Sequence, residues 1–497
     1  MTLMHNALLQ LALPEVMVAI AALLALAVDV ALLRQAAVRT RVAVAAVIGT
    51  AGCAAAIARI VLHPQTVDVL GGTLISNPVI HIVQTAILVV AALALWMAVD
   101  SAFTEYVGEY VLLMLLATVG MLFLVATQNL LVLFIALELL SLSLYAMAGF
   151  DRRSPRSAEA GLKYFLFGGM SAGFMLFGFS LLYGTTNAIT LPQIGAAVQA
   201  DGMTPLLAIA LVTTVIGFGF KVAAAPLHFW APDVYEGAPL PSAAFIASAS
   251  KIASFYIFYQ VMTIALGGVA GTAWPHGGVA GWVPVLAIVA VVSMVLGNLV
   301  AIAQSSVRRL LAYSAVGHAG YMLLAIICHS QQSLGALIYY VITYALTTLG
   351  AFAVVGVVQE KTGGDSLADF EGLSRREPML AGCLMIFLLS LAGIPPLAGF
   401  FGKFYLFVSV LAVAPRPLGL LWMVALAVAM SAVSLYYYLQ VLKRAFVSVP
   451  AADAGPIQTP VLRKLLIVAL AAAVVVLGCA PNLLLRCIVA ACSTVGI

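Results

Sequence analysis

Five ionisable side chains lie inside long apolar runs of this sequence. A charged group at the centre of a bilayer costs on the order of 2.5–3.5 kcal/mol, so such groups usually face a bundle interior or water. Amines and a carboxylate held at that depth can take up and release protons through neighbouring polar groups. The residue types therefore indicate proton transfer, and the five candidates are Glu138, Lys163, Lys221, Lys251 and Lys403.

Two of these residues are expected to form a pair. Burial disfavours the charged form of a lysine, whereas a nearby carboxylate favours it. An ion pair of Glu138 with Lys221 could therefore switch the lysine between holding and releasing a proton. The alternative is a static ion pair that only sets helix packing.

Histidines and hydroxyl groups lie along the chain between these candidates. His228 and His318 are accessory candidates, and we expect a hydrated string of groups that runs from Glu138 to Lys403. Hydroxyl groups in apolar helices are better explained by interhelical hydrogen bonds, and this applies to Tyr344, Thr347 and Thr348.

Proline interrupts two of the apolar runs close to a lysine. Pro226 has no amide hydrogen, so the carbonyl of Val222 loses its helical donor, and Pro395–Pro396 do the same to Leu391 and Ala392. Broken backbone at membrane depth is tolerated only where protein or water satisfies the freed groups. One broken helix in each half of the chain is typical of an internally repeated transporter. Because five spans separate the breaks, the two halves should be inverted.

The elements that must position these groups are membrane-spanning helices. The chain is 64% hydrophobic and only 8% charged, with a mean hydropathy of +1.16, which is typical of a polytopic all-α membrane protein. The first apolar stretch has no basic residue before it and is expected to be a retained span rather than a signal peptide. We expect about fourteen spans, centred near residues 24, 51, 89, 118, 138, 172, 215, 253, 293, 318, 346, 397, 430 and 473.

The basic residues are distributed unequally between the two sides of these spans. Loops after odd-numbered spans contain fifteen of the 22 basic residues, loops after even-numbered spans contain only Arg59, Arg416 and Arg486, and four lysines lie within spans. Cytoplasmic loops collect Lys and Arg, so both termini should face the periplasm. The fifteen are Arg34, Arg39, Arg41, Arg152, Arg153, Arg156, Arg308, Arg309, Lys361, Arg375, Arg376, Lys443, Arg444, Arg463 and Lys464.

Redox and metal sites are not expected in this chain. The six cysteines are scattered without a CxxC motif, and no histidine pair has metal-ligand spacing. "GFGFKV" lacks the third glycine of a dinucleotide-binding motif and follows no strand.

Two long motifs carry a family resemblance. "GFGFKVAAAPLHFWAPDVYEGAPLPSAAFIASASKIASF" and "LAGIPPLAGFFGKFYLF" resemble the antiporter-like subunits of respiratory complex I, the bacterial NADH-quinone oxidoreductase. The resemblance covers about residues 10 to 485. "PDVYEGAP" is similar to the N-type subunits, and Lys403 favours the N-type over the M-type, because some sibling subunits have glutamate there.

The resemblance implies a single transmembrane domain of two inverted five-helix repeats, spans 4–8 and 9–13, with broken helices at spans 7 and 12. The corresponding ranges are 1–100 for three N-terminal helices, 108–266 and 283–445 for the repeats, and 460–490 for one C-terminal helix.

The resemblance also implies proton translocation coupled to quinone reduction in other subunits of the complex. Glu138 and Lys221 would form the ion pair of the first half-channel, Lys251 would be the central lysine and Lys403 the exit-side group. Lys163 would be an accessory of the uptake path.

The same resemblance implies the partners and the location. NAD, FMN, iron–sulfur clusters and quinone are expected in partner subunits rather than here. The partners would be other membrane subunits, including sibling antiporter-like subunits, in a hetero-oligomer in the bacterial inner membrane, with lipids and without nucleic acid. Two alternatives stay open: a subunit of a cation/proton antiporter or membrane-bound hydrogenase, and a membrane scaffold that conducts no protons.

Overall fold

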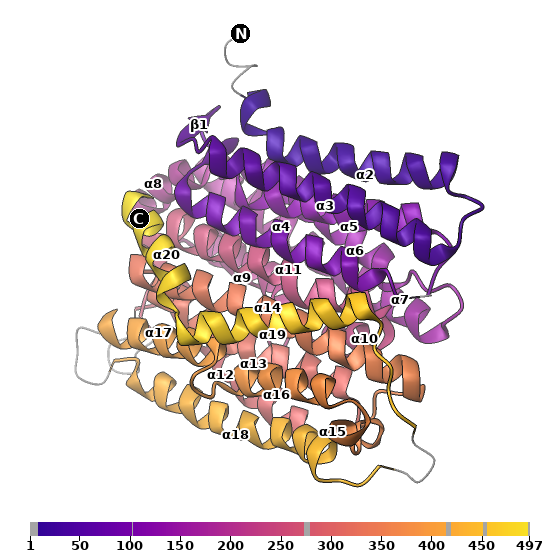
Figure 1. The fold of residues 1–497 in the computed structure, drawn as a ribbon. Helices are drawn as coiled ribbons and strands as arrows, with labels where there is room; N and C mark the ends of the chain where they lie inside the picture. Colours follow the sequence, from indigo (N-terminus) through magenta and orange to yellow (C-terminus); the bar gives the residue numbers. More distant parts are fainter. Residues whose placement is uncertain (1–7, 102, 273–278, 414–418, 451–454, 496–497) are drawn as a thin grey trace.

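The computed structural model describes residues 8–101, 103–272, 279–413, 419–450 and 455–495 as a bundle of long helices that run side by side (Figure 1). Within these residues, twelve helices are long and apolar enough to cross a membrane. They are α2 (Leu13–Leu32), α3 (Val38–Leu62), α4 (Pro78–Ala98), α5 (Val107–Val125), α6 (Leu130–Ala148), α7 (Pro155–Thr186), α11 (Leu240–Gln260), α12 (Trp282–Ile302), α13 (Val307–Cys328), α14 (Gln331–Thr362), α18 (Leu421–Phe446) and α19 (Val461–Cys479).

Two further spans are each made of two shorter helices. The first consists of α9 (Pro205–Lys221) and α10 (Trp230–Gly237), and the second of α16 (Pro378–Ala392) and α17 (Ala398–Val413). These are the seventh and twelfth spans, so the prediction of about fourteen helices with breaks at those two places is confirmed. The inverted relation of the repeats and the ranges 1–100, 108–266 and 283–445 stay predictions.

Local sequence explains where many of the spans begin. Asn129 caps α6 and Ser154 caps α7 by accepting hydrogen bonds from amides of the first turn. Thr204 does the same for α9. Proline follows as the first helical residue in α7 and α9, where its missing N–H costs nothing.

The chain ends in two helices rather than one. The predicted C-terminal helix over 460–490 was wrong, because α19 ends at Cys479 and α20 (Asn482–Val495) follows. Pro481 lacks an amide hydrogen and disfavours helical backbone in the preceding residue. Ala480 accordingly leaves the helix, with φ −130° and ψ 63°.

Other short elements were not predicted from the sequence. An antiparallel hairpin of β1 (Val67–Val69) and β2 (Leu74–Ser76) joins α3 to α4, with Val67 paired to Ser76. The remaining elements are α8 (Leu191–Asp201), η1 (Val261–Ala265), η2 (Gly267–Val269), η3 (Leu367–Phe370) and α15 (Leu373–Arg376).

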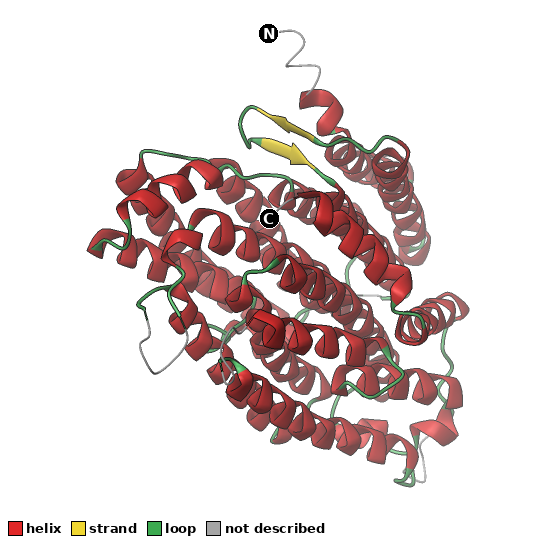
Figure 2. Cartoon of the chain, turned by 90° about the vertical axis from the view of Figure 1, so that its left-hand side faces the viewer, coloured by secondary structure: helices red, strands yellow, loops and turns green. Residues whose placement is uncertain are grey.

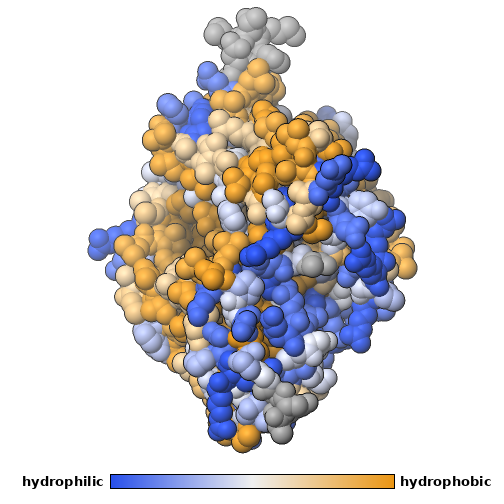
Figure 3. All heavy atoms as spheres, turned by 45° about the vertical axis from the view of Figure 1, so that its right-hand side comes forward, coloured by the Kyte–Doolittle hydropathy of each residue, from blue (hydrophilic) through white to orange (hydrophobic). Residues whose placement is uncertain are grey.

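The two ends of the bundle differ in polarity. We call the end that carries α10, α15 and the start of α7 the basic end. Figure 3 shows that hydrophilic residues gather at this end, whereas hydrophobic residues cover the flank. Figure 2 looks at the opposite end, which carries the hairpin and the C-terminus. Exposed large side chains such as Leu23 and Leu62 lie on the flanks, as a lipid solvent requires.

The centre of the bundle is formed by α11, α13 and α14, which are buried almost all round. The N-terminal helices are fixed to this bundle by a polar anchor: the carboxylate of Asp29 accepts two hydrogen bonds of 2.7 Å from Arg41 and one of 2.9 Å from the amide of Gly108. Asp29 therefore ties α2 to α3 and α5.

Candidate functional site

Lys221, the last residue of α9, reaches α6. Its Nζ donates to the hydroxyl of Ser141 and, over 3.1 Å, to the hydroxyl of Tyr145. The predicted ion pair with Glu138 is not formed within the described residues. Glu138 is half-buried on α6, three residues before Ser141 and so on the same side of that helix. Two hydroxyl groups, rather than a carboxylate, hold this amine.

Lys251 lies in the middle of α11 with only 1% of its surface exposed. Its Nζ donates to the carbonyl of Ala315 on α13 over 3.0 Å and to the carbonyl of Val222 over 3.4 Å. The second acceptor is the carbonyl that the first break was predicted to free. The ring of Tyr344 lies 5.6 Å from the amine.

Lys403 donates to the freed carbonyls of the second break in the same way. Its Nζ donates to the carbonyls of Leu391 (3.0 Å) and Ala392 (2.9 Å), the two groups that the sequence predicted to lose their helical donors. A third hydrogen bond, of 2.8 Å, goes to the hydroxyl of Ser431 on α18. The ring of Tyr321 lies 5.1 Å from the amine. At each break, a buried lysine therefore donates hydrogen bonds to carbonyls that lack their helical donor.

His318 lies on α13 between these two lysines. Its Nδ1 is 2.7 Å from the hydroxyl of Tyr340 and its Nε2 is 3.5 Å from the hydroxyl of Tyr438. Its ring centroid is 5.0 Å from that of Tyr344, which faces Lys251, and 5.8 Å from that of Tyr321, which faces Lys403. Both ring nitrogens have a hydroxyl partner, which is the arrangement that a proton-shuttling imidazole needs.

These contacts form a string of neighbouring residues through the middle of the bundle. Hydrogen bonds join Tyr145 to Lys221 and Lys251 to the carbonyl of Val222, and contacts with aromatic rings join the members from Lys251 to Lys403. The string crosses from α6 to α9, then to α11, α14, α13 and α17, so it joins both halves of the chain. Every member is buried or in contact with a buried member. In order, the string contains Tyr145, Lys221, Val222, Lys251, Tyr344, His318, Tyr321 and Lys403.

Several buried polar atoms near the string have no protein partner in the described residues. They include the hydroxyls of Tyr235 and Thr348 and the Nδ1 of His228. His228 stacks on Phe229, and none of the contacts above includes it. Buried polar atoms in proteins are almost always satisfied, if not by protein then by water.

Lys163 lies apart from the string, at the basic end. Its Nζ is 2.6 Å from Asp233 and 2.7 Å from Glu159. Asp233 also accepts from Arg309 over 2.8 Å, and Glu236 accepts from the same arginine over 3.0 Å. This ion-pair cluster links α7 and α10 of the first half to α13 of the second.

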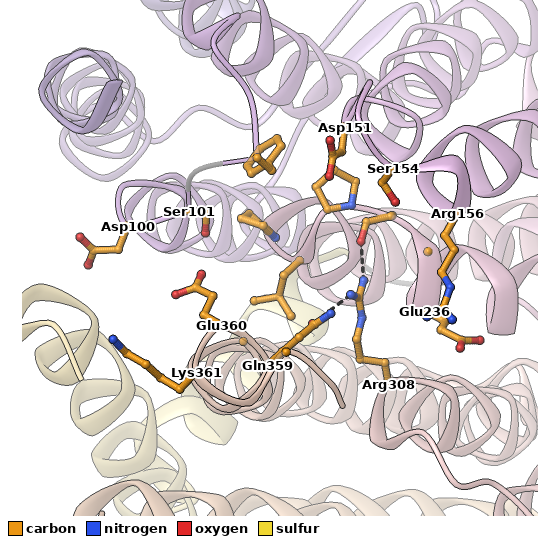
Figure 4. A pocket seen from close by; sticks show the side chains of 18 residues that line it. Asp100, Ser101, Asp151, Ser154, Arg156, Glu236, Arg308, Gln359, Glu360 and Lys361 are labelled. Atoms are coloured by element: carbon orange, nitrogen blue, oxygen red, sulfur yellow. Dashed lines mark hydrogen bonds between the residues drawn. The ribbon is translucent and has the colours of Figure 1, made fainter. Parts of the chain in front are cut away.

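The adjacent Arg308 binds the end of α10 differently. Its Nε donates to the carbonyl of Tyr235 over 2.7 Å, a terminal nitrogen donates to the carbonyl of Ala238, and the other donates to Gln359 over 3.2 Å. These groups border a polar cavity of about 610 Å³ between the two halves (Figure 4).

Sequence analysis missed the hydroxyl partners of the amines. Ser141 and Tyr145 follow Glu138 by three and seven residues, so helical spacing alone placed them on one side of α6. Ser431 and Tyr340 had no such signal, because each comes from the next helix along the chain, where helical spacing does not predict contacts.

Comparisons with known proteins agree with this architecture. The family described as "NADH:quinone oxidoreductase/Mrp antiporter, TM" matches residues 127–433. The chain is 51% identical over 492 residues to "NADH-quinone oxidoreductase subunit N 2" of Acidobacterium capsulatum, with 97% of this chain and 98% of the relative covered.

Solved structures are similar over nearly the whole chain. A chain of respiratory complex I from Thermus thermophilus with bound Aureothin is 33% identical, with a TM-score of 0.77 and coverage of 95% of this chain and 98% of that chain. A chain of the Mrp complex from Dietzia sp. DQ12-45-1b is 21% identical, with a TM-score of 0.80 and coverage of 98% and 97%, and it shows the shared fold alone.

Proposed function

Since the chain belongs to the NADH:quinone oxidoreductase/Mrp antiporter membrane-subunit family, we propose that it is the proton-translocating subunit N of a bacterial NADH-quinone oxidoreductase. Electron transfer from NADH to quinone then takes place in other subunits, and this chain moves protons. The observation that carries the proposal is the string of buried lysine, histidine and tyrosine side chains between Lys221 and Lys403, which neighbour one another through the carbonyl of Val222 and through aromatic rings.

The acceptors around the two lysines that close the breaks indicate where a proton rests. An ammonium group has three hydrogens to donate, and an uncharged amine has two. Lys403 has three acceptors, whereas Lys251 has two. Lys403 therefore has the fuller set of acceptors for a charged ammonium, and the proposal places the resting proton there and the next proton on Lys251.

His318 connects the two amines. A neutral imidazole accepts a proton at one nitrogen and releases one from the other. The hydroxyls of Tyr340 and Tyr438 lie at those two nitrogens and relay the proton with water. In the described residues neither hydroxyl has a hydrogen bond to Lys251 or Lys403, so the proposed path needs water between the hydroxyls and the amines.

Glu138 and Lys163 act on the first half of the path. Moving Lys221 from the hydroxyls of Ser141 and Tyr145 towards Glu138, one turn away, would stabilise its charged form and draw a proton in. Lys163, in the ion-pair cluster at the basic end, is an accessory of proton uptake, and His228 is a second accessory group.

The assembly follows from the same proposal. The basic end faces the cytoplasm, so both termini face the periplasm of a bacterial inner membrane. The chain is one subunit of a hetero-oligomer with other membrane subunits, including antiporter-like siblings. NAD, FMN, iron–sulfur clusters and quinone are bound in the partner subunits.

The proposal is tested by replacing Lys251 with methionine in the intact complex. We expect the complex to assemble, with NADH-driven proton pumping in membrane vesicles at least about tenfold lower, a barrier change of ~1.4 kcal/mol. Exposed Lys443→Met is the matched control and should pump normally. Normal pumping by Lys251→Met would instead indicate a scaffold. Purification with partners that exchange cations but do not oxidise NADH would indicate an antiporter.

A further inference from the structure

A second cavity opens on the flank of the bundle, away from the proton string. It has a volume of about 690 Å³ and lies between α3 and α4 on one side and α19 and α20 on the other, with α14 as its floor. Its lining is almost entirely apolar and includes Ile60, Val61, Val89, Leu346 and Leu484. Val61 is 63% exposed, so the cavity is open to the surrounding medium. We call it the flank groove.

The helix α20 places one wall of the flank groove at the membrane boundary. Its 14 residues measure about 21 Å, too short to cross a hydrocarbon layer of about 30 Å. It lies across the ends of the spans at the end opposite the basic end (Figure 1). Ile488 and Cys492 are buried against the bundle, while Leu483 and Val489 are exposed. An amphipathic helix in this position lies at the depth of lipid headgroups.

Four of the five helices that line the flank groove carry no negative charge, although the hairpin that joins α3 to α4 carries exposed Asp68. The helices α3, α4, α19 and α20 contain neither Asp nor Glu. Arg486 precedes the groove residue Cys487 on α20, and Arg59 precedes Ile60 on α3. The guanidinium of Arg59 donates to the carbonyls of His63 (2.9 Å) and Gln10 (3.3 Å), and Arg486 is exposed with no ion pair in the part of the chain that the structure describes.

These two arginines are exceptions to the distribution of basic residues over the two sides of the protein. A third exception, Arg416, lies outside the described residues. Positive charge at this end is not explained by membrane orientation, because orientation places basic residues at the other end. A specific anion beside the groove explains it.

We propose that the flank groove binds one anionic phospholipid, with an acyl chain in the groove and the phosphate at Arg486, supported by Arg59. The apolar lining fits a hydrocarbon chain, and the guanidinium groups that adjoin the lining residues Ile60 and Cys487 in sequence fit an anionic headgroup. The site is independent of the proton string.

The lipid count of the purified complex tests this site. The intact complex is reconstituted in nanodiscs of phosphatidylglycerol or phosphatidylcholine, transferred to mild detergent and analysed by native mass spectrometry. Ala490→Trp, which fills the groove from α20, should retain one phosphatidylglycerol fewer than the parent. Arg486→Gln should weaken phosphatidylglycerol retention about fivefold, which corresponds to ~1 kcal/mol per basic residue near anionic lipid, and should leave phosphatidylcholine unchanged.

Matched controls are available outside the flank groove. Exposed Ala54→Trp on α3 and exposed Arg34→Gln between α2 and α3 should both retain lipid like the parent. An unchanged lipid count in Ala490→Trp would overturn the proposal, as would equal retention of the two lipids by the parent. A photo-crosslinker on Cys487 that captures a neighbouring subunit instead of lipid would also overturn it.

Discussion

Replacing Lys403 with methionine should stop proton pumping while the complex still assembles. The exchange removes a buried charge, which costs ~2.5–3.5 kcal/mol at the bilayer centre. It leaves the carbonyl of Leu391 without a donor, at a cost of ~1–3 kcal/mol, but the carbonyl of Ala392 keeps a hydrogen bond from Ser431 over 3.1 Å. The methionine sulfur still packs on the ring of Tyr321. The net change in the stability of the folded subunit therefore lies between ~0.5 kcal/mol of destabilisation and ~2.5 kcal/mol of stabilisation.

The assay measures the assembly of the complex and its proton pumping in inverted membrane vesicles. Subunit content is compared by gel, NADH oxidation by absorbance, and acidification of the vesicle lumen by a pH-sensitive dye. We expect parental subunit content with at least about tenfold slower acidification, a change of ~1.4 kcal/mol in the barrier. Exposed Lys443→Met serves as the control. Parental acidification would refute the role of the amine, and loss of the assembled complex would refute the energetic comparison.

Two further substitutions test the surroundings of the string. Tyr340→Phe removes the hydroxyl 2.7 Å from Nδ1 of His318. NADH-driven pumping should slow by on the order of two- to twelvefold, because a hydrogen bond of ~0.5–1.5 kcal/mol is lost. An unchanged rate from pH 6 to 8 would exclude that hydroxyl from the path. Gly399→Ala would place a Cβ 1.9 Å from the carbonyl of Ser390 and should reduce the amount of assembled complex, because the second break loses ~1–3 kcal/mol or more. Gly382→Ala, whose Cβ meets nothing within 4 Å, is the matched control, and equal loss in both variants would contradict this account.

Features governed by local chemistry could be predicted from the sequence. A proline always removes a donor from the carbonyl four residues before it, so the freed carbonyls of Val222, Leu391 and Ala392 could be named in advance. The structure shows that Lys251 and Lys403 donate to them. Hydropathy likewise located the spans, because the bilayer imposes one length on them.

Features that depend on side-chain contacts in three dimensions could not be predicted. The Glu138–Lys221 pair was expected because opposite charges attract, but hydroxyls on the same helix lie closer to the amine. Short elements such as α20 were missed for another reason, since the apolar run passes through Pro481 with little change in composition. The sequence pattern therefore predicts which side chains are buried better than it predicts which groups they contact.

The two adjacent arginines at the start of α13 hold α10 through acceptors with different chemistry. Arg309 binds carboxylates, which release it once they are protonated. Arg308 binds the main-chain carbonyls of Tyr235 and Ala238, which stay unprotonated throughout the physiological pH range. The hydrogen bonds of Arg308 therefore join the two halves at every stage of a proton cycle. Any tilt of α10 is transmitted mechanically to the helix that carries His318, without a charge having to move between them.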